Sequence, residues 1–250
     1  MKPEPDDVEY LLRETGRVLP GLRVEKGRVI AAFAGLRPLA ADQRKDPWSV
    51  GRSHRIHEDP NGLVSVVGGK FTTYRKIAQD AVDWVARRFP EKTLTPCRTA
   101  EMTLGTLTGG WRAGETEQLL RTIVHEEAVQ PSLAARVNER YGDEGSGRIL
   151  FWLKENPSAA QRLCPQHPFI RAEVRYAVEE EMALSLGDLL WRRLQVGWSP
   201  CGGLDCGELA ARWMGEILNW SDEERLSQIA RYQAEAAAAR SALRGDALAG

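Results

Sequence analysis

A pair of glycines between an apolar run and an amphipathic stretch constrains this chain more than any other feature. Residues 63–67 form a short, β-branched run that predicts a strand. Gly68 and Gly69 follow it directly, and residues 74–89 carry apolar side chains at helical spacing. A glycine turn lets the backbone approach a ligand, and the first turn of the helix offers unpaired N–H groups and the positive end of its dipole. The turn is therefore a candidate anion or cofactor site, and an ordinary strand-to-helix turn capped by a threonine is the alternative.

The segment before this turn has the patterns of a mixed α and β region. Apolar spacing from residue 8 predicts a helix that ends at Pro20, and residues 28–36 predict a buried strand because they are apolar, β-branched and aromatic. Residues 53–57 predict a strand that pairs with residues 63–67 through a tight turn at 59–62. We therefore expect a sheet with helices in the first part of the chain.

The second part of the chain has a different character. Residues 91–114 are rich in proline, glycine and threonine, which predicts a linker between a domain at 1–90 and an all-helical domain at 115–250. Ser221 and Glu224 form a capping box before the last helix. Helical periodicity occurs at 115–127, 132–141, 146–155, 169–183, 185–195, 205–218 and 222–243.

Charge and composition exclude several functional classes. The 34 Lys and Arg residues balance 35 Asp and Glu residues, and this net charge of -1 gives no overall basic field that favours nucleic acid. The N-terminus lacks the pattern of a signal peptide, and no apolar run approaches the ~20 residues that span a bilayer. Together these features predict a cytoplasmic protein that does not bind nucleic acid.

Four cysteines raise the question of a metal site. Cys164 with His167, and Cys201 with Cys206, could supply the four ligands that zinc requires. The two pairs do not have the usual spacing, so we interpret them as incidental and predict no metal site. With Cys97, the cysteines are few for a chain of 250 residues, which is typical of free thiols in a reducing compartment.

Three ordered segments, residues 33–39, 51–56 and 68–78, resemble FAD-dependent glycerol-3-phosphate dehydrogenases. Residues 172–183 and 189–193 are similar to the helical C-terminal domain of the same family. The resemblance implies an α+β fold, in which part of an FAD-dependent oxidoreductase with a mixed sheet and helices precedes an all-helical C-terminal domain. It also implies hydride transfer from C2 of sn-glycerol 3-phosphate to FAD, giving dihydroxyacetone phosphate, with the electrons usually passed to a membrane quinone.

The resemblance also assigns site residues. Arg37 and Arg52 match the family's substrate-facing arginines, and a guanidinium fork suits a phosphate dianion; without the family match, both would be interpreted as exposed surface charges. His54 lies two residues beyond Arg52, on the same face of a strand, and is a candidate catalytic proton acceptor or substrate-orienting group; a structural histidine is the alternative. The residues that would line the flavin are Gly68, Gly69, Lys70, Phe71, Thr72 and Thr73.

The chain departs from the family at one point. Family members begin with a G-x-G-x-x-G turn that holds the pyrophosphate of FAD, and no such turn follows a predicted strand here. We therefore expect exposed apolar sheet edges, weak FAD binding and no independent dehydrogenase activity unless a complementary N-terminal chain is present. A peripheral contact with the membrane is expected only of the complete enzyme. A non-catalytic helical interaction module and a fragment of a glycerol-3-phosphate oxidase are the alternatives.

Overall fold

The computed structural model describes residues 3–22, 24–35, 53–92, 95–102 and 131–244. The contacts divide the chain into two units, one formed by residues 1–34 with 105–250 and the other by residues 35–104. Arg37, Arg52, the predicted helix at 115–127 and part of the predicted linker lie outside the described residues, so the expected domain boundaries stay predictions.

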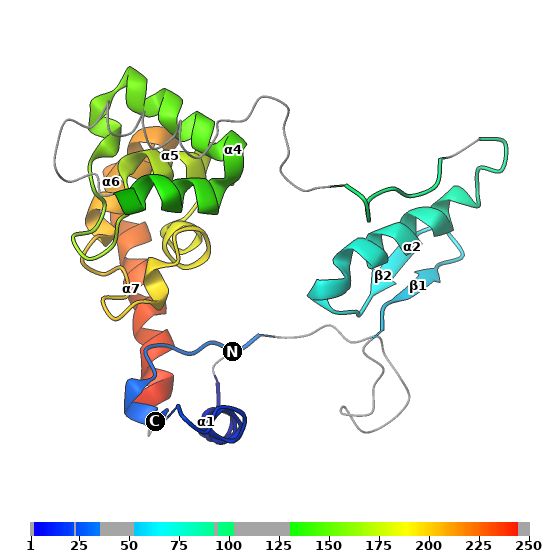
Figure 1. Ribbon diagram of the computed structural model, residues 1–250, viewed down its shortest axis with the longest axis horizontal. Helices are drawn as coiled ribbons and strands as arrows, with labels where there is room; N and C mark the ends of the chain where they lie inside the picture. The colour runs from blue at the N-terminus through cyan, green and yellow to red at the C-terminus, as the bar shows by residue number, and fades with distance from the viewer. Residues whose placement is uncertain (1–2, 23, 36–52, 93–94, 103–130, 245–250) are drawn as a thin grey trace. The chain divides into compact units, whose positions relative to one another are not determined.

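The first unit is helical (Figure 1). This confirms the expected helical character of the C-terminal part within residues 131–244. Gly142, with φ 62°, separates the two predicted helices at 132–141 and 146–155, which are drawn in green. The elements are α1 (Pro5–Val18), η1 (Lys26–Arg28), α4 (Pro131–Glu155), η4 (Pro157–Ala160), α5 (Arg171–Glu179), η5 (Asp188–Arg193), η6 (Val196–Trp198), α6 (Gly207–Leu218) and α7 (Asp222–Arg244).

Two apolar clusters form the core of this unit. The larger one joins α5, η5, α6 and α7, and its fully buried members include Leu190, Met214 and Tyr232. The smaller one gathers side chains of α4 around Leu150 and Ile170. The cap expected before α7 is present, because the Glu224 N–H donates to the Ser221 hydroxyl at 3.1 Å.

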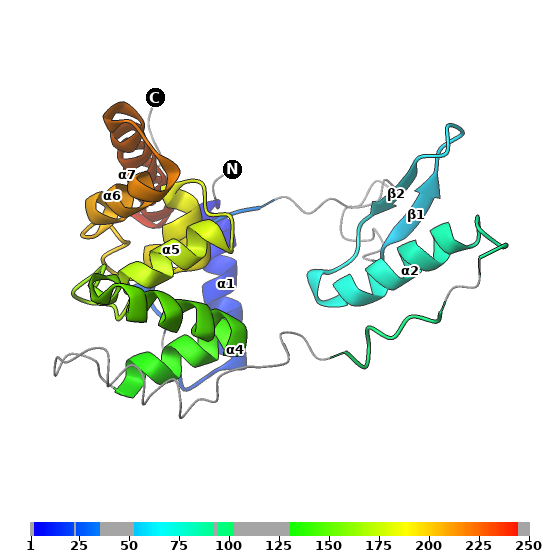
Figure 2. The same cartoon turned by 90° about the horizontal axis from the view of Figure 1, so that it is seen from above.

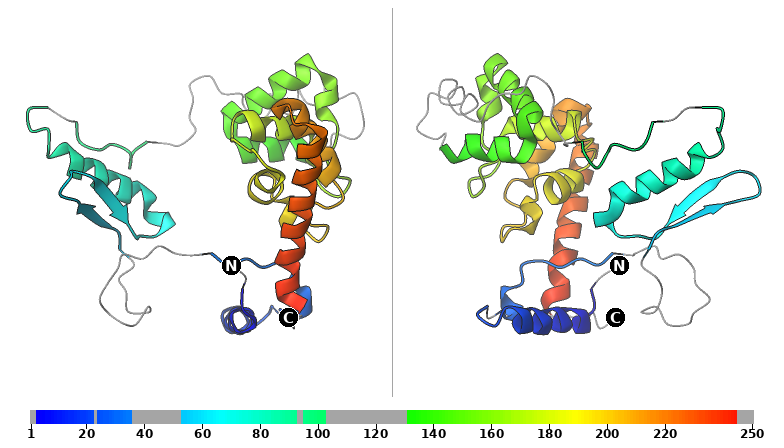
Figure 3. Two further views of the ribbon diagram at one scale, coloured as in Figure 1. Left: turned by 180° about the vertical axis from the view of Figure 1, so that it is seen from behind. Right: turned by 45° about the vertical axis from the view of Figure 1, so that its right-hand side comes forward.

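The N-terminal segment corrects one sequence expectation. The buried strand predicted at residues 28–36 is wrong as far as the structure describes it, because residues 29–35 are extended but form no strand. The Ala32 N–H instead donates to the carbonyl of Ala239 in α7 at 3.1 Å, and Phe33, which is 76% exposed, contacts Trp198 with ring centroids 5.3 Å apart. Figure 3 shows this segment and α1 beside the C-terminal end of α7. An extended segment becomes a strand only where another strand completes its ladder of hydrogen bonds.

The second unit is a hairpin covered by one helix (Figure 2). Strand β1 (Arg55–Glu58) pairs antiparallel with β2 (Val64–Val67), and η3 (Phe71–Thr73) leads into α2 (Tyr74–Ala86). The predicted turn is confirmed, since Gly62 has φ 88° and its N–H donates to the Asp59 carbonyl at 2.8 Å.

This second unit has no core of its own within the described residues. No side chain in residues 53–92 or 95–102 is buried, and large apolar side chains such as Leu63, Val82 and Tyr74 are more than half exposed. A hairpin with a single helix buries too little apolar surface to be stable alone. The unit therefore needs further protein surface, while the mixed sheet expected of a larger oxidoreductase domain stays a prediction.

Candidate functional site

The turn between β2 and α2 is shaped by its two glycines. Gly68 has φ 80° and Gly69 has φ 91°, a region that side-chain-bearing residues rarely adopt. A Cβ atom at Gly69 would also lie 2.7 Å from Cδ1 of Ile77 and 3.2 Å from Cβ of His54. Glycine at position 69 is therefore required by the close packing of strand and helix as well as by the backbone angle.

The residues after the glycines are open to solvent. Lys70, Phe71, Thr72 and Thr73 are all exposed, and the Phe71 ring is 90% exposed. Thr73 stands at the N-cap of α2, but its hydroxyl donates back to the Lys70 carbonyl at 2.9 Å and makes no cap hydrogen bond. The threonine cap of the alternative interpretation is thus absent, and the first N–H of α2, that of Tyr74, donates to the Phe71 carbonyl in η3.

His54 lies beside this turn and is held by a carboxylate. Its Nε2 atom lies 3.0 Å from Oδ2 of Asp80 in α2, and both side chains are half-buried. Lys76 Nζ lies 2.7 Å from the other oxygen of Asp80. The hydrogen bond from Lys76, and to a smaller extent that from His54, lowers the pKa of Asp80 below its ordinary value. The structure therefore brings His54, Gly69 and Asp80 together.

Asp80 is the site residue that the sequence did not reveal. Its spacing from Lys76 predicts an i,i+4 ion pair on a helix face. Nothing in the sequence pairs it with His54, which is 26 residues away. The other strand histidine, His57, is 70% exposed, and its Nε2 lies 3.1 Å from Oδ1 of the turn residue Asp59. Arg37 and Arg52 lie outside the described residues, so their placement beside His54 stays a prediction.

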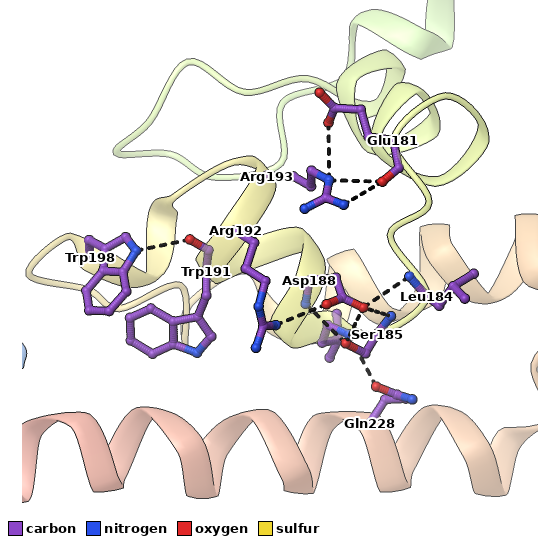
Figure 4. Close-up of polar contacts among 10 residues, drawn as sticks. Glu181, Leu184, Ser185, Asp188, Trp191, Arg192, Arg193, Trp198 and Gln228 are labelled. Carbon is purple, nitrogen blue, oxygen red and sulfur yellow. Dashed lines mark hydrogen bonds and ion pairs between the residues drawn. The ribbon is translucent and has the colours of Figure 1, made fainter. Parts of the chain in front are cut away.

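The helical unit has a polar network at the start of η5 (Figure 4). The Asp188 carboxylate accepts the Ser185 N–H at 3.1 Å, the Ser185 hydroxyl at 2.8 Å and the Leu184 N–H at 3.3 Å. Arg192 donates to the same carboxylate at 3.0 Å. Burial raises the pKa of Asp188, but the hydrogen bonds from Ser185 and Leu184 and the charge of Arg192 outweigh it, so the pKa lies below the ordinary value. This network fixes the start of the π-helical turn.

The neighbouring arginine and tryptophans are also engaged within the unit. Arg193 donates to the Glu181 carbonyl at 3.0 and 2.6 Å, and the Trp198 indole donates to the Trp191 carbonyl at 3.0 Å (Figure 4). The rings of Trp191 and Trp198 meet edge to face at 4.5 Å between centroids. These contacts assign a structural role to the side chains drawn in Figure 4.

A groove of about 400 Å³ lies between α4, α5 and α6. Arg175 stacks over Trp152 at 4.3 Å and also pairs with Glu179 at 2.8 Å. Arg171 lies over Trp213 at 5.6 Å. The groove is thus lined by charges of both signs that already contact one another or an aromatic ring, which gives no net attraction for an anion.

Within the part of the chain that the structure describes, no helix combines the length and the apolar character that crossing a membrane requires.

Comparison with known proteins places this chain. A probable mitochondrial glycerol-3-phosphate dehydrogenase of Caenorhabditis elegans is 32% identical over 91% of this chain and 32% of the relative. The mitochondrial glycerol-3-phosphate dehydrogenase of Mus musculus is 31% identical over 92% of the chain and 32% of the relative. The glycerol-3-phosphate dehydrogenase of Mycobacterium leprae is 31% identical over 91% of the chain and 38% of the relative. The chain thus spans about a third of the length of the curated relatives it matches.

Residues 97–225, more than half of the chain, match a family model described as the C-terminal domain of alpha-glycerophosphate oxidase. The match agrees with the resemblance in the sequence and with the helices that the structure shows over residues 131–218. The chain therefore belongs to the family of the C-terminal domain of alpha-glycerophosphate oxidase.

Proposed function

We propose that this chain forms the C-terminal part of an FAD-dependent glycerol-3-phosphate dehydrogenase, which oxidises sn-glycerol 3-phosphate to dihydroxyacetone phosphate. The observation that carries the proposal is the turn at Gly68 and Gly69, held at positive φ and packed against Ile77 and against His54, which pairs with Asp80. The names of the relatives support the substrate, since they are called glycerol-3-phosphate dehydrogenases.

The turn suits a flavin in two respects. The glycine backbone carries no Cβ, and the four following residues are exposed. Lys70 adds an exposed positive charge at the same edge. FAD, when bound, supplies the hydride acceptor, while the protein supplies orientation and electrostatics.

The remaining roles belong to side chains that face the substrate. Arg37 and Arg52 bind the phosphate group and the C2 oxygen, because guanidinium groups match oxyanions bidentately and stabilise developing negative charge. His54 accepts the proton of the C2 hydroxyl as the hydride leaves. Asp80 fixes Nε2 of His54 as the N–H donor, which leaves Nδ1 as the nitrogen that accepts a proton.

Catalysis by this chain requires more protein surface than residues 53–102 provide. No described side chain of that segment is buried, and the 250 residues contain no G-x-G-x-x-G turn after a strand. The part of the relatives that this chain does not match would complete both the sheet and the FAD site. A cytoplasmic location, a peripheral contact with the membrane and a quinone as electron acceptor belong to this proposal for the complete enzyme.

A flavin-binding experiment tests the proposal. The chain is purified alone and together with a co-expressed polypeptide that carries the G-x-G-x-x-G half of a relative, each sample is mixed with FAD and desalted, and the visible spectrum is recorded. We expect flavin absorption to persist only in the co-expressed sample and to bleach on addition of glycerol 3-phosphate. Retention of flavin by the chain alone contradicts the need for completion, and absence of bleaching in a flavin-loaded complex contradicts the assigned substrate.

Two histidine variants test the proton acceptor through the rate at which glycerol 3-phosphate bleaches the flavin-loaded complex. His54→Asn should slow bleaching about 10²–10⁴-fold, the range that general-base catalysis contributes. His57→Asn is the matched control, because His57 lies on the same hairpin but is exposed and contacts Asp59 only in the turn. Equal rates for His54→Asn and the control would assign His54 a structural role.

A second candidate function is a helical interaction module without catalysis. It is favoured by the contrast in burial, since the helical unit has two apolar clusters and residues 53–92 have no buried side chain. In that case substitution of Arg37, Arg52 and Lys70 leaves partner binding unchanged. A glycerol-3-phosphate oxidase is the third alternative, and oxygen consumption by the completed, flavin-loaded complex distinguishes it from a dehydrogenase.

A further inference from the structure

Two loops of the helical unit bring soft metal ligands together. One loop precedes α5 and carries Cys164 and His167, and the other precedes α6 and carries Cys201 and Cys206. The loops are 34 residues apart in sequence as measured from His167 to Cys201. Their convergence is therefore a property of the fold, which the sequence pattern alone did not predict.

The ligand atoms of these loops form two groups of three that share Cys164. Sγ of Cys164, a ring nitrogen of His167 and Sγ of Cys201 all lie within 4.8 Å of one another. Sγ of Cys164 also lies within 4.8 Å of Sγ of Cys206 and of a carboxylate oxygen of Asp205, with these three again mutually within that distance. Cys164 thus belongs to both sets, and it is fully buried.

One distance agrees with tetrahedral zinc. Nε2 of His167 and Sγ of Cys201 are 3.6 Å apart. In a tetrahedral site with Zn–S of about 2.3 Å and Zn–N of about 2.0 Å, neighbouring sulfur and nitrogen ligands are about 3.6 Å apart. The pair therefore has the spacing of two corners of such a site without any movement of the loops.

The second loop is fixed by α7. Gly202 and Gly203 have φ 62° and 67°, and a Cβ atom at Gly203 would lie 2.8 Å from the hydroxyl oxygen of Tyr232. That hydroxyl donates to the Gly202 carbonyl at 2.6 Å, and Arg240 donates to the carbonyl of Pro200 at 2.9 Å. Hydrogen bonds from two side chains of α7 therefore hold the backbone of the loop that carries Cys201 and Cys206.

We propose that Cys164, His167, Cys201 and Cys206 bind one zinc ion in a tetrahedral site that fastens the loop before α5 to the loop before α6. Three sulfurs and one imidazole select zinc over magnesium or calcium, which prefer oxygen ligands. Four protein ligands make a closed, structural site. Cys206, whose Sγ lies within 4.8 Å of Sγ of Cys164, is the fourth ligand that we assign. This assignment departs from the free thiols expected from sequence spacing.

Asp205 takes an outer role in this site. Its carboxylate accepts the Cys164 thiol at 3.2 Å in the present structure, and the residue is exposed, unlike Cys206. A thiolate is the preferred zinc ligand where a buried sulfur and an exposed carboxylate compete for one position. Asp205 is thus a hydrogen-bonding neighbour, and the fourth ligand is Cys206.

Metal analysis of the full chain tests the proposal. The protein is produced in zinc-supplemented medium, purified with a reductant, dialysed against metal-free buffer and analysed by plasma mass spectrometry. We expect about one zinc per chain for the wild type, and the same for Cys97→Ser, because Cys97 is an exposed thiol of the other unit. Cys164→Ser and Cys206→Ser should each lose most of the zinc, and Asp205→Asn should retain it.

Cobalt substitution gives a readout that does not depend on variants that fold poorly. Replacing zinc with cobalt(II) in the wild-type chain should produce thiolate-to-cobalt charge-transfer absorption and the visible bands of tetrahedral cobalt. Strong chelation should lower Tm by on the order of 10 °C, because structural zinc contributes directly to folding.

Four results overturn the proposal. The first is a wild-type chain that binds neither zinc nor cobalt when the metal is added in excess, and the second is a loss of zinc in Cys97→Ser as large as that in Cys164→Ser. The third is a disulfide between two of the ligand cysteines in freshly purified protein. The fourth is a zinc content that depends on Asp205 but not on Cys206. The last result would exclude the ligand set assigned here.

Discussion

Replacing Arg136 with methionine should destabilise the helical unit by about 3–5 kcal/mol, because it leaves a buried carboxylate without its counter-charge. The Glu173 side chain is 0% exposed, and its oxygens Oε1 and Oε2 lie 2.6 Å from Nη1 and Nη2 of Arg136, respectively. It also accepts the Ile170 N–H and the Tyr141 hydroxyl, each at 3.0 Å. Methionine fills a similar space but supplies neither donors nor charge.

The structure sets this magnitude in two ways. Removing one partner of a buried ion pair costs about 3–5 kcal/mol, and two hydrogen bonds to a charged group at about 1.5–3 kcal/mol each give a similar total. Glu173→Gln should cost less, because it removes the buried charge while the amide oxygen can still accept the Ile170 N–H. A loss of this size corresponds to a fall in Tm on the order of 10 °C for a unit of this length.

Urea denaturation followed by circular dichroism measures the effect. The matched control is Arg225→Met, because Arg225 pairs with Asp222 at 3.0 Å at the start of α7, where the Asp222 side chain is 86% exposed. The control should change the free energy of unfolding by less than about 1 kcal/mol. If Arg136→Met costs no more than the control, the carboxylate of Glu173 is not charged and buried in the way described here.

Three further predictions concern other contacts. Asp188→Ala should cost about 1–2 kcal/mol at neutral pH, because alanine removes the acceptor for the N–H groups of Leu184 and Ser185. Since the folded-state pKa of Asp188 is lowered from 3.8, the charge-dependent part of this stabilisation exists above pH 3.8 and is lost as the pH falls through the folded-state pKa, so a pH-independent difference from the wild type refutes it. Gly69→Ala should abolish flavin retention in the co-expressed complex, because its Cβ would lie 2.7 Å from Ile77, and unchanged flavin content contradicts this. Tyr232→Phe should lower stability by about 1 kcal/mol in thermal melts, because the buried hydroxyl donates to the Gly202 carbonyl at 2.6 Å, and no change in Tm contradicts it.

Local patterns in the sequence predicted local structure well. The turn at Asn61 and Gly62, the strand that returns as β2, the helix after Gly69 and the cap at Ser221 all appear in the structure. Each depends on a few neighbouring residues, because positive φ, alternation of apolar residues and cap hydrogen bonds act over one turn or one strand.

The strand predicted at residues 28–36 shows where such patterns fail. The segment has the composition of a buried strand, but β structure also requires a partner, and the Ala32 N–H bonds to a carbonyl of α7 instead. The predicted helix over residues 169–183 likewise ends as α5 at Glu179, since Met182 adopts φ 56° before the Asp188 network begins. The composition of these segments specified neither the acceptor of the Ala32 N–H nor the residue at which α5 ends.

The sequence by itself therefore determined the family, the glycine turn and most of the helices, because these follow from short-range spacing of residues. Only the tertiary structure decided which polar side chains meet. His54 pairs with Asp80 across 26 residues, Arg136 pairs with Glu173 across 37, and His167 meets Cys201 across 34. Separations of this length are closed by packing of helices and loops, and the sequence specifies that packing collectively, not through any motif that contains both partners.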